Sequence, residues 1–258
     1  MTLNPLRRKI SEGGVSLGTI VFSGNSHITE MLACLGYDFI VIDAEHTFTS
    51  PENMLAQVRA VQVCPGCTPV LRVPGHDPDA LKGVMDFLGV DNLMFPLVQS
   101  ADEARALVSA CTYPRKGIRG YAGTTRLTRF GTLKDYAATA NDRQCLIAQI
   151  ESEEAMKRIL DIGRVPGIHA LFIGLGDLAQ EMGVPRGMAD PEFREYVGRA
   201  VAECAAHGIS VGSFQFSLDG ARYFREKGGN IISLGSDLRY VADNAKHDLT
   251  ALLAAAGH

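Results

Sequence analysis

Residues 39–46 read FIVIDAEH, a short apolar run that ends in charged side chains. A nearly continuous apolar run of this length is typical of a strand buried on both faces, as in a parallel sheet covered by helices. Residues 28–35 before it carry apolar side chains at helical spacing. Residues 50–52 after it, Ser-Pro-Glu, match a helix start, with a cap residue before a proline. The stretch therefore predicts a strand between two helices.

The same alternation of strand-like runs and amphipathic helices continues along the whole chain. Eight strand–helix units in 258 residues predict one (β/α)₈ barrel (TIM barrel) that spans residues 1–258 as a single domain. A doubly wound open sheet is the alternative, but no G-x-G-x-x-G follows the first strand. Residues 113–141 interrupt the rhythm and are expected to form a long loop. The expected strands are residues 16–23, 39–43, 68–73, 92–98, 144–151, 170–177, 210–216 and 230–235.

Composition excludes several classes of protein. The chain is 46% hydrophobic and 21% charged, which excludes wholesale disorder. A net charge of −4 argues against nucleic acid as a partner. No apolar run approaches the ~18 residues that a membrane span needs, and no signal peptide is recognisable. We therefore expect a cytoplasmic protein with neither a nucleic-acid nor a membrane partner.

The six cysteines do not match a disulfide scaffold. Most of them, Cys34 among them, fall within apolar patterns and are expected to be small buried hydrophobic residues in a reducing compartment. Cys64-Pro-Gly-Cys67 is a lone C-x-x-C motif. Because no second C-x-x-C or spaced histidine pair accompanies it, a turn before a strand is favoured over a redox pair or half of a zinc site.

Charged groups follow four of the expected strands. Barrel enzymes place their active groups at the carboxyl ends of the strands. The second strand ends in residues 43–46, the third at Arg72, the fifth at residues 149–151 and the sixth at residues 174–177. A solvated rim would also carry charge, so the functional interpretation depends on all four together.

Glu151 and Asp177 are two carboxylates without a lysine beside them on their strands. Two carboxylates at one site repel unless a cation or proton intervenes, and a divalent ion with oxygen ligands fits that requirement. Helix capping is the alternative role for both. His46 could be a ligand, but its ordinary pKa near neutrality favours proton transfer. Arg72 is a permanent cation for a carboxylate or oxyanion, and its alternative role is a salt bridge to an acid in residues 43–45.

Lysine is absent from the seven strands after the first. An aldolase that works through a Schiff base needs a desolvated lysine in its site. Imine chemistry is therefore disfavoured, and metal-assisted enolate chemistry remains.

Six short motifs occur in one order and together resemble the class II, metal-dependent pyruvate aldolases. This group of the HpcH/HpaI aldolase/citrate lyase family includes 4-hydroxy-2-oxoheptanedioate aldolase and 2-dehydro-3-deoxyglucarate aldolase. Each motif alone is weak, but six with fitting spacing are specific, and the similarity covers roughly residues 5 to 255. The motifs are Asp43-Ala44-Glu45-His46, Leu71-Arg72-Val73-Pro74, Phe95-Pro96-Leu97-Val98, Gly117-Ile118-Arg119-Gly120, Gln149-Ile150-Glu151 and Gly174-Leu175-Gly176-Asp177-Leu178.

The resemblance implies a barrel of the phosphoenolpyruvate/pyruvate type and a homo-oligomer, a trimer or hexamer, with the last helix swapped onto a neighbour. It implies an enzyme that cleaves or forms a carbon–carbon bond next to a 2-oxo acid such as pyruvate, with an aldehyde as the other reactant. It also implies Mg²⁺, Mn²⁺ or Co²⁺ as cofactor.

The resemblance also assigns roles to residues. It places the metal carboxylates at Glu151 and Asp177, the essential arginine at Arg72, the histidine at His46, and that histidine's acid partner at Asp86. Asp86 is expected at the amino-end face of its own barrel, so a neighbouring subunit would have to supply it. The expected substrate contacts are Gln149, Gly174, Gly176, Ser213 and Phe214.

Two departures from the family pattern leave the size and polarity of the substrate open. Residues 174–179 read GLGDLA where relatives often have Gly-Pro-x-Asp-Leu-Ser, and residues 213–215 are bulkier than usual. A lyase for acyl-CoA esters, like the citrate lyase β-subunit, is one alternative, but it needs a basic groove, and only Arg115, Lys116 and Arg119 are candidates. A non-catalytic metabolite-binding barrel is the other, and the four retained rim groups argue against it.

Overall fold

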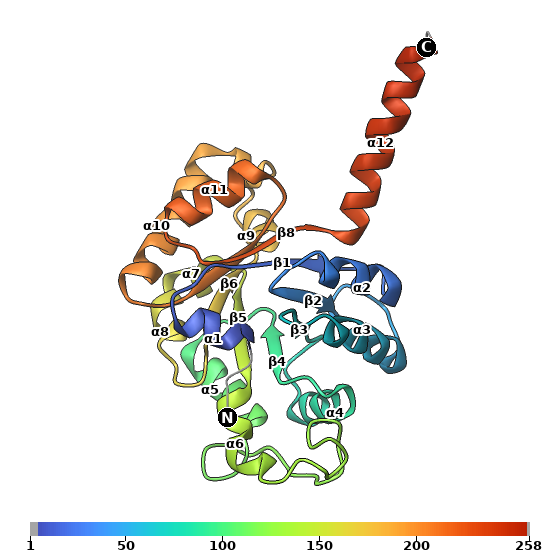
Figure 1. The fold of residues 1–258 in the computed structure, drawn as a ribbon. Coiled ribbons are helices and arrows are strands. Elements are labelled where there is room, and N and C mark those ends of the chain that lie inside the picture. Colours follow the sequence, from blue (N-terminus) through green and yellow to red (C-terminus); the bar gives the residue numbers. More distant parts are fainter. Residues whose placement is uncertain (1–4, 257–258) are drawn as a thin grey trace.

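The computed structural model describes residues 5–256, in which eight parallel strands close into a barrel (Figure 1). Each strand pairs with the next, and β1 pairs with β8 to complete the ring, which confirms the predicted (β/α)₈ fold. The strands are β1 (Ser16–Val21), β2 (Phe39–Asp43), β3 (Thr68–Arg72), β4 (Asn92–Phe95), β5 (Cys145–Ile150), β6 (Ala170–Ile173), β7 (Val211–Gln215) and β8 (Ile231–Ser236).

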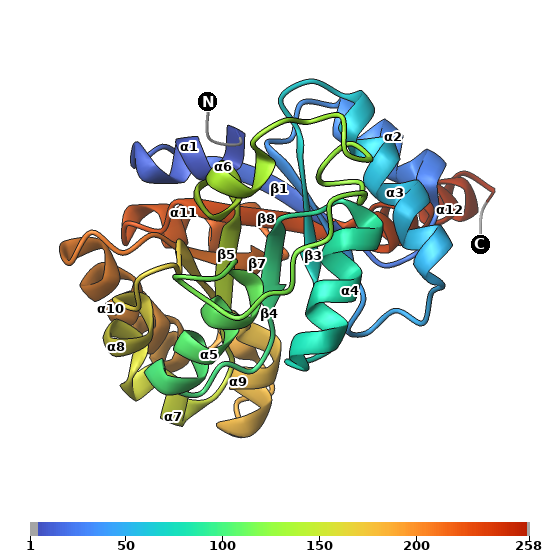
Figure 2. The same cartoon turned by 90° about the horizontal axis from the view of Figure 1, so that it is seen from below.

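Helices surround the strands, as the view from below shows (Figure 2). Ser50 and Asp190 cap α3 and α10 with their side chains, each before a proline, as the sequence predicts. The helices are α1 (Pro5–Ser11), α2 (Ser26–Cys34), α3 (Pro51–Val63), α4 (Pro78–Leu88), α5 (Ala101–Cys111), α6 (Tyr136–Arg143), α7 (Glu153–Lys157), α8 (Ile159–Gly163), α9 (Leu175–Glu181), the 3-10 turn η1 (Gly187–Ala189), α10 (Pro191–Ala206), α11 (Leu218–Glu226) and α12 (Asp237–Ala255).

Side chains along each strand alternate between the barrel interior and the helix layer. Phe39 and Val41 of β2 pack in one cluster with Phe172 of β6, whereas Ile42 packs in the cluster that includes the helices. This alternation has period two because successive side chains of a strand point to opposite faces. At the carboxyl-end rim of the barrel, the side chains in the inward-facing positions are polar. Asp43, Arg72 and Gln149 are among them.

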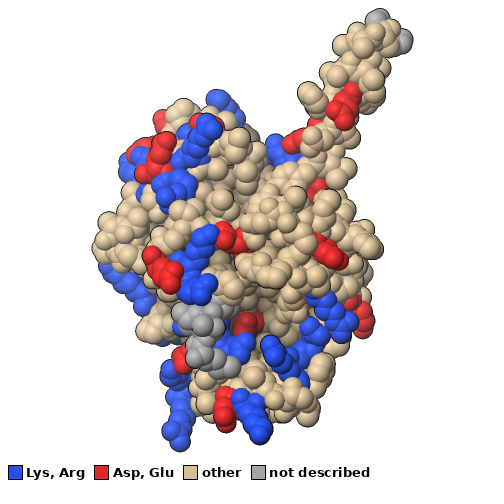
Figure 3. Space-filling view, viewed as in Figure 1, with Lys and Arg blue, Asp and Glu red and all other residues tan. Residues whose placement is uncertain are grey.

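Helix α12 leaves the barrel instead of covering it (Figure 1). Asp237 is its only buried residue among those described, and the rest of the helix projects from the barrel, with no charged side chain in the described residues after Asp248 (Figure 3). A cavity of about 290 Å³ lies between its base and α2, and another of about 440 Å³ lies between the β1/β8 seam and α11. The helix exposes an apolar stripe at Leu238, Val241, Leu249 and Leu252. A stripe of this kind is typical of a helix that packs on another surface.

Three local expectations are wrong. Residues 113–141 are not all loop, because α6 begins at Tyr136. Strand β6 ends at Ile173, before the expected boundary. Cys34 and Cys64 form a disulfide instead of remaining thiols, because α2 packs against α3 and brings their carboxyl ends together. The expected turn at residues 64–67 is present.

Within residues 5–256, no helix combines the length and the apolar character needed to cross a bilayer.

Candidate active site

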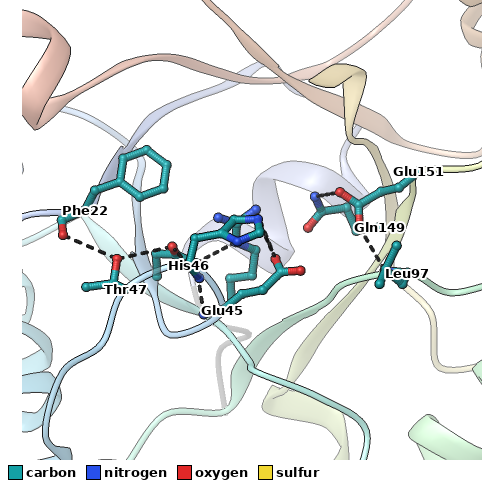
Figure 4. A network of polar contacts seen from close by, with 9 residues as sticks. Phe22, Glu45, His46, Thr47, Leu97, Gln149 and Glu151 are labelled. Atoms are coloured by element: carbon teal, nitrogen blue, oxygen red, sulfur yellow. Dashed lines mark hydrogen bonds and ion pairs between the residues drawn. The ribbon is translucent and has the colours of Figure 1, made fainter. Parts of the chain in front are cut away.

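The rim of the barrel brings together the candidate residues of β2, β3, β5 and α9. Figure 4 shows Glu45, His46 and Thr47 after β2 on one side, with Gln149 and Glu151 from β5 and Leu97 after β4 on the other. Each lies where a strand ends, so the closure of the barrel collects groups that are more than a hundred residues apart in the chain.

Arg72 is 4% exposed and makes two ion pairs. Its Nε lies 2.7 Å from Asp43 Oδ1, and its Nη1 lies 3.2 Å from Glu45 Oε2. The salt bridge considered from sequence is therefore present. A guanidinium has five N–H donors, so these two pairs orient Arg72 and leave donors for a further anion. Its Cζ lies 5.5 Å from the ring centre of Phe214.

Asp43 shapes the loop that carries His46. The carboxylate is buried; Oδ1 accepts from the Glu45 amide at 3.2 Å, and Oδ2 accepts from the His46 amide at 3.1 Å. Thr47 Oγ1 donates to the same Oδ2 at 3.3 Å. Asp43 thus fixes both Arg72 and the loop. The sequence offered one signal for this role, an acid that ends a buried strand.

The His46 side chain is 58% exposed. Its Nε2 lies 3.8 Å from Glu45 Oε2, and this is the one ion pair of His46 within the described part of the chain. The imidazole therefore stands at the open side of the site, where it can exchange a proton with a bound molecule or with water.

Glu151 is held from two sides (Figure 4). Its Oε2 accepts the Leu97 amide at 2.9 Å, and its Oε1 accepts from Gln149 Nε2. The pKa of Glu151 is raised to about 7, mainly by burial and also by the carboxylates of Glu45 and Asp177, against the lowering effect of the Leu97 amide. Burial disfavours the charged form of a carboxyl group, so a nearby cation would stabilise the Glu151 carboxylate.

Gly174 makes room for that carboxylate. A Cβ at this position would overlap Glu151 Oε1. The Gly174 amide itself donates to the Ile150 carbonyl at 2.9 Å, so a substrate contact at Gly174 would have to come from another atom than this N–H.

Asp177 lies in the first turn of α9, not at the end of a strand as expected. The turn also contains Gly176, and the first amides of a helix have no helical acceptor. Asp177 raises the pKa of both Glu45 and Glu151, with burial the largest cause in each case, so the three carboxylates face a common space.

The oxygen atoms around this space suit a divalent cation. Three carboxylates gather there, and Gln149 Oε1 is buried without a hydrogen-bond partner among residues 5–256. Mg²⁺ and Mn²⁺ prefer such oxygen ligands and keep several waters. No group of three or more His, Cys, Asp or Glu side chains in the described chain forms a ready-made metal cage. An ion would therefore bind through Glu151 and Asp177, with substrate and water completing its shell.

Two expected residues lie elsewhere. Asp86 on α4 pairs with Arg119 at 2.5 Å, and no recorded contact within residues 5–256 joins it to His46. Ser213 is fully buried in β7, and its side chain faces the helices rather than the barrel interior. A direct substrate contact by its hydroxyl does not fit this position. Phe214, the next residue, faces the interior and stacks edge-on against Phe172.

Comparison with known proteins shows consistent likenesses. The model of the family described as HpcH/HpaI aldolase/citrate lyase matches residues 18–244. A Novosphingobium aromaticivorans protein named 4-hydroxy-2-oxovalerate aldolase is 37% identical, over 91% of this chain and 89% of that protein. A Pseudomonas putida protein named 2-dehydro-3,6-dideoxy-6-sulfogluconate aldolase is 35% identical, over 92% of each.

The fold has a close structural counterpart as well. The crystal structure of an HpcH/HpaI aldolase/citrate lyase family protein from Burkholderia cenocepacia J2315 superposes with a TM-score of 0.91 at 30% identity. The match covers 96% of this chain and 99% of that one.

Proposed function

The chain belongs to the HpcH/HpaI aldolase/citrate lyase family, and on that premise we propose that it is a metal-dependent aldolase of the pyruvate type. It reversibly cleaves a 4-hydroxy-2-oxo acid to pyruvate, or a related 2-oxo acid, and an aldehyde. The observation that carries the proposal is the cluster of Glu45, Glu151 and Asp177 opposite Arg72 at the rim.

Glu151 and Asp177 hold the divalent ion, Mg²⁺, Mn²⁺ or Co²⁺, in this proposal. Once bound, the ion supplies a Lewis acid for the 2-oxo group and the adjoining carboxylate. The pKa of Glu151, raised to about 7 mainly by burial, is expected to fall when a cation takes its place beside the carboxylate.

Arg72 stabilises the oxygen on which enolate charge develops. Its pairs with Asp43 and Glu45 fix the guanidinium before the reaction, so little reorganisation is needed. Gln149 and the amide of Gly176 contact the 2-oxo acid, and Phe214 forms the wall beside it. His46 moves the proton of the aldol hydroxyl, directly or through water, which suits its exposed position.

The acyl-CoA alternative loses support. Arg119, one of the three basic residues that could hold CoA phosphates, is buried, pairs with Asp86 and stacks over Tyr113. No observation favours a second function.

Metal removal tests the proposal. We expect the protein to release pyruvate from a 4-hydroxy-2-oxo acid, to lose this activity in EDTA, and to regain it with Mg²⁺, Mn²⁺ or Co²⁺. Pyruvate can be measured by coupling to lactate dehydrogenase. Full activity in EDTA, or trapping of a pyruvate adduct on the protein by borohydride, would contradict a metal-dependent mechanism.

We also propose a cytoplasmic, single-domain protomer that assembles into a homo-trimer or hexamer. The exposed stripe of α12 and the fully exposed Phe48, two residues after His46, support burial by another copy. In such an assembly α12 packs on a neighbour, and a neighbour's Asp86 partners His46.

The relatives leave the far end of the substrate open. One relative's name specifies a sulfo group, and the other's does not. Which group this chain's substrate carries at its far end must therefore be inferred from the residues around the site.

A further inference from the structure

A groove of about 440 Å³ extends away from the described reaction site, between α9, the η1 segment, the end of β7 and the start of α12. Arg239, near the start of α12, and residues of α9 line it together. Clefts of this size hold small organic molecules.

The groove begins at the reaction site. Gly176, which lines it, directly precedes the proposed metal ligand Asp177. Phe214, which also lines it, lies over Arg72. A molecule whose 2-oxo acid end occupies the rim can therefore extend its other end along this groove.

The walls of the groove combine an apolar surface with positive charge. Leu175, Met188 and Phe216 supply apolar surface, which suits a short methylene chain. Arg186 and Arg239 are the charged residues of the lining, and no acidic residue accompanies them there.

Both arginines retain donors for a ligand. Arg186 forms no ion pair within residues 5–256, and its recorded hydrogen bond, to the Ala189 carbonyl, is 3.4 Å long. Arg239 lies 5.3 Å over the ring of Phe216 and pairs with Asp243 at 3.1 Å. Exposed pairs of this kind are weak, so Asp243 does not prevent Arg239 from binding another anion.

Gln215 adds a second, independent observation. It lines the groove, it is 2% exposed, and its Nε2 has no hydrogen-bond partner among the described residues. A buried donor without a partner is uncommon and costly, and it marks a place where an acceptor is missing.

We propose that this groove binds the distal end of the substrate, a short chain that ends in a carboxylate or another acid group, with Arg186 and Arg239 as its cationic partners and Gln215 as a neighbouring donor. Guanidinium groups bind planar acid groups through paired hydrogen bonds. The proposal rests on the proposed aldolase function and specifies its substrate class.

Two substrates of equal chain length test it: 4-hydroxy-2-oxoheptanedioate, which has a distal carboxylate, and 4-hydroxy-2-oxoheptanoate, which does not. We expect wild-type protein to prefer the dioate. Arg186→Gln and Arg239→Gln should each lower kcat/KM for the dioate about tenfold and leave the neutral substrate within about twofold. Arg199→Gln, at an exposed site on α10 outside the groove, is the matched control and should change neither value.

The outcomes separate the two proposals. Pyruvate release from both substrates at equal kcat/KM, or a preference that survives the double variant, overturns the groove assignment and leaves the aldolase standing. If neither substrate releases pyruvate, the aldolase proposal fails, and saturation-transfer NMR with succinate decides the groove. Binding to wild type that the double variant loses supports the groove, whereas no binding, or equal binding, overturns it. Activity of each variant on the neutral substrate and an unchanged Tm show that it is folded.

Discussion

At the scale of single residues, the site depends on how closely the backbone approaches one carboxylate. Glu151 lies against Gly174, where a side chain would occupy the same volume as Oε1. Glycine is therefore required here by space alone, since its backbone is not in the left-handed region. Gly174, which itself binds neither metal nor substrate in this proposal, therefore sets the position of Glu151, the proposed metal ligand.

Gly174→Ala should weaken metal binding. The added methyl group must displace Glu151, and such overpacking costs about 1–3 kcal/mol. We expect Mn²⁺ affinity, measured by calorimetry, to fall about 10- to 100-fold. Gly75→Ala is the control, because a Cβ there meets nothing within 4 Å. Equal affinity for Mn²⁺ in both variants would contradict the role of Glu151 as a ligand.

His169 predicts a pH dependence of stability that is independent of the reaction site. Its pKa is lowered to about 4, mainly by burial and in second place by the Arg7 guanidinium. The Leu146 amide donates to His169 Nδ1 at 3.0 Å, which requires that nitrogen to be unprotonated. In the unfolded chain, His169 takes up a proton near its ordinary pKa of 6.5. Protonation therefore favours the unfolded state between about pH 6.5 and pH 4.

We therefore expect the stability that His169 contributes to be present above about pH 6.5 and lost as pH falls towards 4, with a size of about 1–3 kcal/mol. Urea unfolding of wild type and His169→Gln at pH 4.5 and 7.5 measures it. The difference between the two proteins should shrink or reverse at the lower pH. His207→Gln, at an exposed helix end, is the control. A difference that does not depend on pH would refute the assignment.

At the scale of elements, the loop between β4 and α5 is held by a side chain from another loop. His76 Nε2 lies 2.6 Å from the Pro96 carbonyl, and Nδ1 lies 2.8 Å from Glu103 Oε1. The next residue, Leu97, has φ of 52°, a left-handed conformation that a leucine adopts at a cost. This conformation points the Leu97 amide at Glu151. His76 thus acts on Glu151 through the loop as a positioning residue.

His76→Ala should release the loop. We expect faster amide hydrogen exchange at residues 97–100 and about tenfold weaker Mn²⁺ binding, since one charge-assisted hydrogen bond is worth about 1.5–3 kcal/mol. His207→Ala should change neither property. Unchanged exchange at Leu97 would show that α5 alone holds the loop.

At the scale of the whole molecule, α12 projects from the barrel beside the β1/β8 seam instead of covering it. The helix buries one residue of its own, and the cavity at its base is lined mostly by apolar side chains. In the proposed assembly, we expect α12 of a second copy to pack on this side of the barrel.

Charges on the stripe should disrupt this assembly. We expect Leu249→Asp combined with Leu252→Asp to convert the oligomer to a monomer in light scattering coupled to size exclusion, with a large loss of activity if neighbouring Asp86 serves His46. Lys246→Asp, off the stripe on the same helix, is the control. A wild-type protein that is already monomeric, or a double variant that remains oligomeric, would contradict the assembly through α12.

The sequence by itself determined the barrel and most of its rim. Apolar runs and helix starts are local patterns, and residues such as Arg72 and Glu151 follow from them because a strand that ends in a charge delivers it to the rim. The same reasoning named Gly174 and Asp177 but placed them on a strand, whereas β6 ends at Ile173 and the backbone turns into α9, which carries Asp177.

Only the tertiary structure decided the contacts between distant segments. It paired Cys34 with Cys64 by packing α2 on α3, and it joined Asp86 to Arg119. It also placed Arg186 and Arg239 on one groove. No local sequence pattern predicts these contacts, because each depends on the relative orientation of two elements. Barrel closure and the packing of the core set that orientation. The number of residues between the two partners in the sequence does not predict it.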